Sequence, residues 1–143
     1  MAFKVHKGKT KFVWRPITVS TEFDSNSLLA WDTGRLIAAT STSSPLIIEG
    51  VLRHAIASTD DDYATTRDVE VEVPVEGNVE WEGDVTSGLV VTDLGGYFDL
   101  TDASTVDRSA SNYDVAKCVG RLSATKGIFI LNIGTTGNGI AGD

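Results

Sequence analysis

The sequence predicts an all-β fold, a small antiparallel β-barrel or sandwich with an extended N-terminal arm. Three observations predict it. Apolar residues recur with a period of two along most of the chain, as they do in half-buried strands. Turn residues separate these runs at short intervals, which is typical of small β folds. The chain lacks a convincing apolar stripe of helical period.

The first fifteen residues differ in charge from the rest of the chain. They hold five cations and no acid, which leaves seven bases and all twenty acids for the remainder, a net charge of −13 against −8 for the whole chain. This asymmetry predicts a basic N-terminal arm over residues 1–15 and an acidic barrel or sandwich domain over residues 16–133. The glycine-rich residues 134–143 are expected to form a flexible tail.

The first half of the chain offers five strand segments. Phe12–Trp14 and Ile17–Val19 flank Pro16. Residues 28–31 lead into Asp32-Thr33-Gly34 and out through residues 36–38, which predicts a hairpin with Gly34 at the position that needs a positive φ. Residues 46–52 form a longer run, and its Gly50 predicts a bulge or sharp bend of the kind that a small barrel needs to close.

The second half contains the clearest alternation, in which the valines of residues 69–75 share one face and glutamates the other. Gly77-Asn78 and a second alternating run over residues 79–82 predict a hairpin. Further strands are expected at residues 89–91, 97–98, 115–122 and 128–133, with loops at 53–68 and 102–114 and one short helix between 104 and 110. Residues 118–122 share an apolar-x-Gly-x-Leu pattern with residues 48–52, which leaves an internal duplication open.

No residue pattern predicts an enzyme, a cofactor or a metal site. Asp32-Thr33-Gly34 matches the catalytic triplet of aspartic proteases, but a second such triplet is absent, so only a homodimer could supply the paired aspartate. A hairpin turn explains the Asp32-Thr33-Gly34 triplet better than a catalytic role does. The G-x-G-x-x-G pattern at residues 137–142 lacks a helix after it, and Asp60–Asp62 lacks the alternate spacing of a calcium loop. His6 and His54 lack ligands at metal-site spacing.

The single cysteine, Cys118, lies in an alternating run and is expected to be a buried thiol. Neither a signal peptide nor a membrane span is predicted, and synthesis in a cytoplasm is expected.

The arm carries the strongest functional signal. Its predicted partner-binding residues are Lys4, Lys7, Lys9, Lys11, Phe12, Trp14 and Arg15. Aromatic and arginine side chains are typical interface anchors, which favours a protein partner. A frayed terminus and nucleic-acid binding remain as alternatives.

The chain resembles the decoration, or cement, proteins of tailed double-stranded DNA phages. The resemblance lies in the extended N-terminal segment, residues 29–36 (LAWDTGRL), residues 48–52 (IEGVL) and residues 119–122 leading into 127–130. It implies a non-enzymatic β domain on the outer capsid surface of a virion, where a homotrimer binds the major capsid protein and stabilises the shell. Nucleic acid, membranes and small-molecule substrates are not expected partners.

Two other functions stay open. A tail or fibre module could bind a glycan or protein through a groove lined by Trp31, Trp81, Tyr97 and Tyr113, although the core is the simpler place for these rings. An aspartic-protease-like hydrolase would depend on Asp32.

Overall fold

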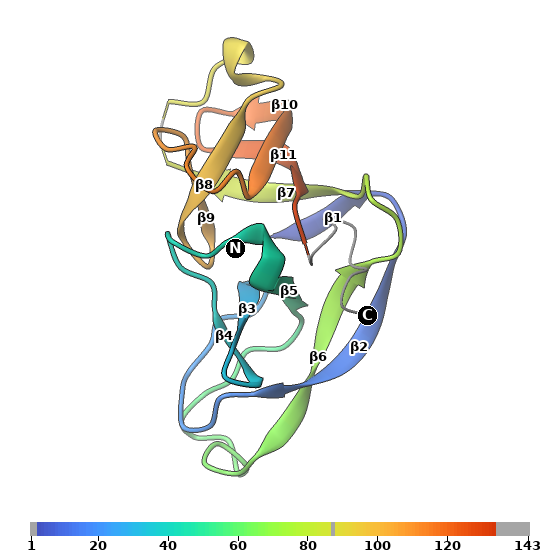
Figure 1. The fold of residues 1–143 in the computed structure, drawn as a ribbon, viewed down its shortest axis with the longest axis vertical. Helices are drawn as coiled ribbons and strands as arrows, with labels where there is room; N and C mark the ends of the chain where they lie inside the picture. The colour runs from blue at the N-terminus through green and yellow to red at the C-terminus, as the bar shows by residue number, and fades with distance from the viewer. Residues whose placement is uncertain (1–2, 87, 134–143) are drawn as a thin grey trace.

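The computed structural model describes residues 3–86 and 88–133 and confirms the all-β fold class (Figure 1). The strands are β1 (Lys4–Lys7), β2 (Thr10–Ile17), β3 (Leu28–Asp32), β4 (Arg35–Ala38), β5 (Ile48–Leu52), β6 (Arg67–Pro74), β7 (Glu80–Val85), β8 (Tyr97–Asp102), β9 (Thr105–Asp107), β10 (Ala116–Ser123) and β11 (Lys126–Leu131). Two short 3₁₀ turns, η1 (Pro45–Ile47) and η2 (Val91–Asp93), lie between strands.

Five strands of the first half close into a barrel in the order β2-β4-β3-β5-β6, the lower part of Figure 1. Its longest pairing joins β2 and β6, antiparallel from Thr10–Pro74 to Ile17–Arg67. One parallel contact, between Ile17 and Leu36, joins β2 to β4 and completes the ring. The valines of β6 point into this barrel as their alternation predicted, because Val69, Val71 and Val73 contribute to its core.

The second half repeats this topology. Its strands β7, β11, β10, β8 and β9 are joined by antiparallel pairings, and a parallel pairing of β9 with β7 closes the ring. The closing contacts match: Thr18 N–H donates to Leu36 O at 3.0 Å, and Thr86 N–H donates to Val106 O at 3.0 Å. The two halves therefore share strand order, pairing direction and closure.

The similar sequences at residues 48–52 and 118–122 form β5 and β10, which hold the same place in the two rings. A bulge lies beside each glycine, as predicted, but against different neighbours. Gly50 pairs with Leu29 of β3, whereas Gly120 pairs with Ile128 of β11. The likeness is one of local backbone shape and does not extend to the register of the two strands.

A shared core joins the halves. β1 lies outside both rings and pairs with β7. Phe3 donates its N–H to Asn26 O in the first half at 3.0 Å, and its ring packs on Gly83 of β7, where a Cβ atom would come within 2.6 Å. The larger core cluster mixes residues of both halves, among them Leu28 and Ile48 with Trp81 and Phe129.

The structure corrects the prediction of a separate arm over residues 1–15. Its described residues, from Phe3 on, form β1 and most of β2, and the expected boundary between residues 15 and 16 falls inside β2. The physical reason is that Val13 and Ile17 pack in the first barrel, and β2 satisfies an edge of β6 that would otherwise stay open. The expected tail, residues 134–143, lies outside the described residues.

The hairpin predicted around Gly77-Asn78 is also wrong. The flanking strands lie in different sheets, because β2 and β5 occupy the two edges of β6, while β1 and β11 flank β7. Two smaller predictions fail too. Residues 89–91 form no strand where one was expected, because Val91 begins η2. The short helix expected between 104 and 110 is replaced by β9, which closes the second ring.

Candidate partner-binding surface

The outer face of the β2–β6 ribbon carries two exposed aromatic rings. Strand alternation turns Val13 and Ile17 toward the barrel and turns Phe12 and Trp14 outward. Phe12 is 51% exposed and Trp14 61%. Each ring lies opposite a glutamate of β6, Phe12 opposite Glu72 and Trp14 opposite Glu70.

A cation from within the chain, Arg53, lies against both Phe12 and Glu72. The guanidinium of Arg53 lies 5.8 Å from the centre of the Phe12 ring, and its Nη1 lies 3.3 Å from Glu72 Oε1. Thr10 Oγ1 donates a second contact to Glu72 Oε2 at 2.5 Å. The buried carboxylate of Glu72 is thus bound on both oxygens.

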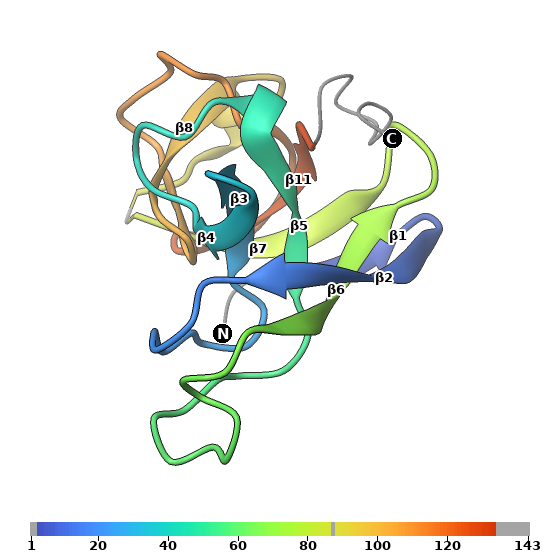
Figure 2. The ribbon, with the colours of Figure 1, turned by 60° about the horizontal axis from the view of Figure 1, so that its bottom comes forward.

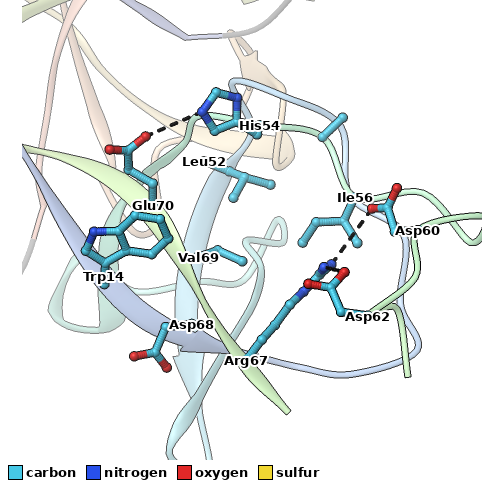
Figure 3. A pocket seen from close by; sticks show the side chains of 11 residues that line it. Trp14, Leu52, His54, Ile56, Asp60, Asp62, Arg67, Asp68, Val69 and Glu70 are labelled. Carbon is cyan, nitrogen blue, oxygen red and sulfur yellow. Dashed lines mark hydrogen bonds and ion pairs between the residues drawn. The ribbon is translucent and has the colours of Figure 1, made fainter. Parts of the chain in front are cut away.

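The Trp14 pair borders an open groove of about 180 Å³ (Figure 3). Trp14, Glu70 and His54 form one side, and Arg67 with its acidic partners Asp60 and Asp62 forms the other. The floor between them is aliphatic, from Leu52, Ile56 and Val69.

The groove exists because β5 and β6 separate. Their pairing ends at Leu52–Val71, and residues 53–66 leave as a loop at the lower end of the barrel (Figure 2). The polar groups on its sides are partly paired. His54 Nε2 lies 3.4 Å from Glu70 Oε1, an ion pair only when the imidazole is protonated. Arg67 pairs with Asp62 and, by hydrogen bonding, holds the pKa of that carboxyl below its usual value.

The predicted cations of the N-terminal segment divide into two groups. Arg15 and Lys4 pair with acids of the same chain. Arg15 Nε donates to Glu49 Oε2 at 2.8 Å, and Lys4 Nζ lies 3.8 Å from Glu82 Oε1. Lys7, Lys9 and Lys11 are exposed around the bend between β1 and β2, and none of them forms an ion pair with another described residue. The structure therefore separates the aromatic pair, on the ribbon's outer face, from a lysine cluster at one end of the ribbon.

Sequence reasoning missed the acidic side of this surface. The sequence predicts a loop over residues 53–68 and places Glu70 on the strand face opposite the valines, and neither expectation brings these acids to Trp14. What brings Glu70 and Asp68 beside Trp14 and Pro16 is the pairing of β2 with β6. That pairing joins residues at least fifty positions apart, so no local sequence signal could have indicated it.

Other candidate motifs have structural roles. Asp32 pairs with Arg35 across the β3–β4 hairpin, and Thr33 and Gly34 at its tip have φ of 50° and 87°, so the predicted turn is confirmed. Trp81 is buried in the shared core, and Trp31 Nε1 donates to Glu49 Oε1 at 3.0 Å. Trp81 is therefore not available to line a groove with the exposed Tyr97 and Tyr113. Within residues 3–86 and 88–133, no group of three or more potential ligands is placed to hold a metal ion.

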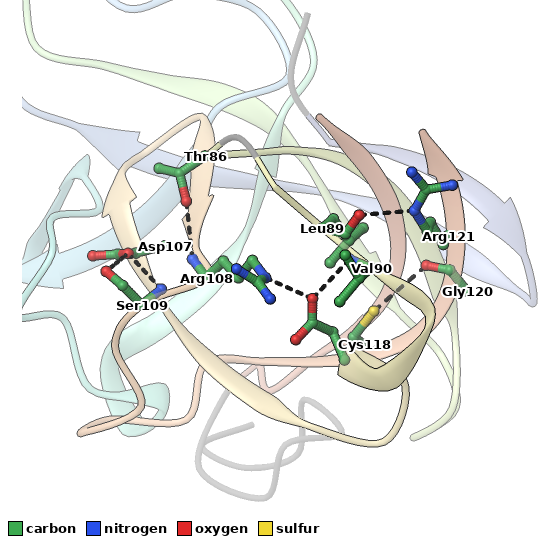
Figure 4. Close-up of polar contacts among 10 residues, drawn as sticks. Thr86, Leu89, Val90, Asp107, Arg108, Ser109, Cys118, Gly120 and Arg121 are labelled. Carbon is green, nitrogen blue, oxygen red and sulfur yellow. Dashed lines mark hydrogen bonds and ion pairs between the residues drawn. The ribbon is translucent and has the colours of Figure 1, made fainter. Parts of the chain in front are cut away.

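Polar contacts in the second half fix the segment around η2 (Figure 4). Asp93 Oδ2 accepts from Arg108 Nε at 2.6 Å and from Val90 N–H at 2.9 Å. These hydrogen bonds, the one from Arg108 first, hold the pKa of Asp93 below its ordinary value. Cys118 is buried as predicted, and burial raises the pKa of its thiol. These contacts tie the segment around η2 to Arg108, which follows β9.

In the part of the chain that the structure describes, no helix has the length and apolar character needed to cross a membrane. Comparison with known protein families found no match, and comparison with curated proteins found none either.

Proposed function

We propose that this chain is a capsid decoration protein, a non-enzymatic structural component of the virion of a tailed DNA phage. It would bind the outside of the shell as a homotrimer and stabilise it, with the outer face of the β2–β6 ribbon against the major capsid protein. The observation that supports this most directly is the pair of exposed rings, Phe12 and Trp14, side by side on a strand of a closed barrel.

Several physical arguments favour protein docking at this face. Large aromatic side chains supply much of the binding energy of protein interfaces. Here the strand that carries them is paired along its length with β6, so binding would order little backbone and would cost little conformational entropy. Lys7, Lys9 and Lys11 at the end of the ribbon would suit acidic groups on the shell. Many copies, each with a modest interface, can hold a shell strongly through multivalency.

Binding to purified shells tests the proposal. The Phe12→Ala/Trp14→Ala variant should lose co-sedimentation with the shell while keeping the circular dichroism of the wild type. The matched control is Val91→Ala, which removes an exposed apolar side chain from η2 in the other half. Docking of the double variant at the wild-type level would overturn the role of this face.

Copy number in purified particles tests the function itself. Quantitative mass spectrometry should give a ratio to the major shell protein near one or a simple fraction of it. A few copies per particle would favour the alternative of a tail or fibre module. Absence from particles would reject the virion proposal.

A further inference from the structure

Two aromatic–carboxylate pairs follow one another on the outer face of the β2–β6 ribbon. In the first, Phe12 and Glu72 hold the guanidinium of Arg53 between ring and carboxylate. In the second, Trp14 and Glu70 have the same cross-strand relation two residues further along both strands. No arginine or lysine of the described chain lies over the Trp14 ring. The ribbon thus has one filled cation site and one of the same construction that opens to solvent.

The groove beside Trp14 has the charge and lining for a cation. It contains four carboxylates, Asp60, Asp62, Asp68 and Glu70, against one permanent cation, Arg67. Asp60 and Asp62 already pair with Arg67. Asp68 has no ion pair with another described residue, and the partner of Glu70 is an imidazole.

The apolar parts of the groove suit the stem of a long basic side chain. Leu52, Ile56 and Val69 form a floor on which methylene groups can be buried while the charged end stays beside the carboxylates. A cation is attracted to the face of an indole ring, and tryptophan is the strongest of the aromatic partners. Arginine fits better than lysine, because its planar guanidinium can stack on the ring and bind a carboxylate through two N–H groups.

We propose that this groove binds an arginine side chain presented by an extended basic segment of the protein on which the chain docks. The inference rests on the proposed function and adds the chemistry of the partner: the shell would supply the cation, and the acidic groove beside Trp14 would receive it. Arg53 on Phe12 is the intramolecular example of the same contact.

A peptide titration tests the inference without any shell. The probe is acetyl-Ala-Val-Arg-Val-Ala-amide, and its control carries citrulline in place of arginine, which keeps the shape and removes the charge. The readout is the indole N–H resonance of Trp14 in the full chain labelled with ¹⁵N. We expect the arginine peptide to shift this resonance, and the citrulline peptide to bind about ten-fold more weakly or not at all.

Variants locate the site. Asp68→Asn/Glu70→Gln should weaken binding of the arginine peptide about five- to ten-fold. The matched control, Asp32→Asn/Glu80→Gln, makes the same change in charge at positions outside the groove and should stay within about two-fold of the wild type, since distant exposed charges are screened by salt. Equal binding of the two peptides, unchanged binding by the groove variant, or the absence of any shift in Trp14 would each overturn the inference.

Shell binding separates this inference from the proposed function. If Phe12→Ala/Trp14→Ala loses docking while Asp68→Asn/Glu70→Gln keeps it, the decoration proposal stands and the cation site is rejected. If the wild type does not bind shells but the peptide titration succeeds, the decoration proposal is rejected and the groove remains a site for basic peptides.

Discussion

At the scale of single residues, barrel closure depends on Gly50. A Cβ atom at this position would lie 2.5 Å from Glu72 O and 2.9 Å from Val71 Cγ1, so β5 approaches β6 more closely than a side chain permits. The bulge falls at the same point, because Leu29 pairs with Gly50 while the next residue of β3 pairs with Ile48. The glycine therefore serves the bend of β5 and its close approach to β6 at once.

Replacing Gly50 with alanine should therefore destabilise the protein. The added methyl group meets a backbone carbonyl that cannot move without disturbing β6, and overpacking of this kind costs about 1–3 kcal/mol. Urea unfolding followed by circular dichroism would measure the loss. Gly120→Ala is the matched control, since its Cβ would come no closer than 3.1 Å to any neighbouring atom, the nearest being on the Ile128 side chain, and it should cost less. Equal losses would contradict the backbone explanation.

At the scale of strands, the sequence predicted where strands lie better than it predicted which strands pair. The Asp32-Thr33-Gly34 hairpin was predictable because its turn chemistry is local. The Gly77-Asn78 hairpin was predicted on the same kind of signal and is wrong, because the edges of β6 and β7 are filled by strands from elsewhere in the chain. Turn residues permit a hairpin, but the edges left open by other pairings decide whether it forms.

The same holds for the candidate site, whose aromatic residues could be predicted from the sequence but whose cross-strand neighbours could not. Phe12 and Trp14 could be identified because aromatic residues alternate with polar ones in a segment rich in lysine. Their carboxylate neighbours could not, since Glu70 and Glu72 reach them only through the long-range β2–β6 pairing. Arg15 was predicted to face a partner but is held by Glu49 in β5, another contact that depends on barrel closure.

The segment around η2 should respond to acid through Asp93. Its pKa is lowered in the folded protein from an ordinary value of 3.8, chiefly by the hydrogen bond from Arg108. The carboxylate therefore contributes stability that is fully present above pH 3.8 and is lost as the pH falls through the lower folded pKa.

The Asp93→Asn variant should be less stable than the wild type at neutral pH, by about 1 kcal/mol for a partly exposed ion pair. The difference should shrink as the pH falls below 3.8. Urea midpoints measured across this range would test the prediction. A constant difference between variant and wild type at every pH would show that the ionised carboxylate is not the source of the stability.

At the scale of the whole molecule, two rings of the same topology share one core. Residues from both halves form the larger core cluster. The Phe3 N–H donates a hydrogen bond to Asn26 O in the first half, and the Phe3 ring packs on Gly83 in the second. Separating the rings would expose Leu28 and Ile48 on one side and Trp81 on the other, all of which are buried. The hydrophobic cost of that exposure couples the stability of each half to the other.

This coupling predicts that the two halves unfold together. Single-tryptophan variants can report on each: Trp14→Phe/Trp81→Phe keeps Trp31 in the first half, and Trp14→Phe/Trp31→Phe keeps Trp81 in the second. Within each variant, the urea midpoint by fluorescence should coincide with that by circular dichroism.

Adding Phe3→Ala to either background should lower both midpoints together, because removing a buried phenylalanine costs about 3–5 kcal/mol and this ring packs between the halves. If the substitution lowered only the Trp81 midpoint, Phe3 would stabilise the second ring alone, and the rings would be independent folding units joined by a linker. A common shift would instead mean that a force applied to the proposed docking face on the β2–β6 ribbon is resisted by the stability of the entire molecule.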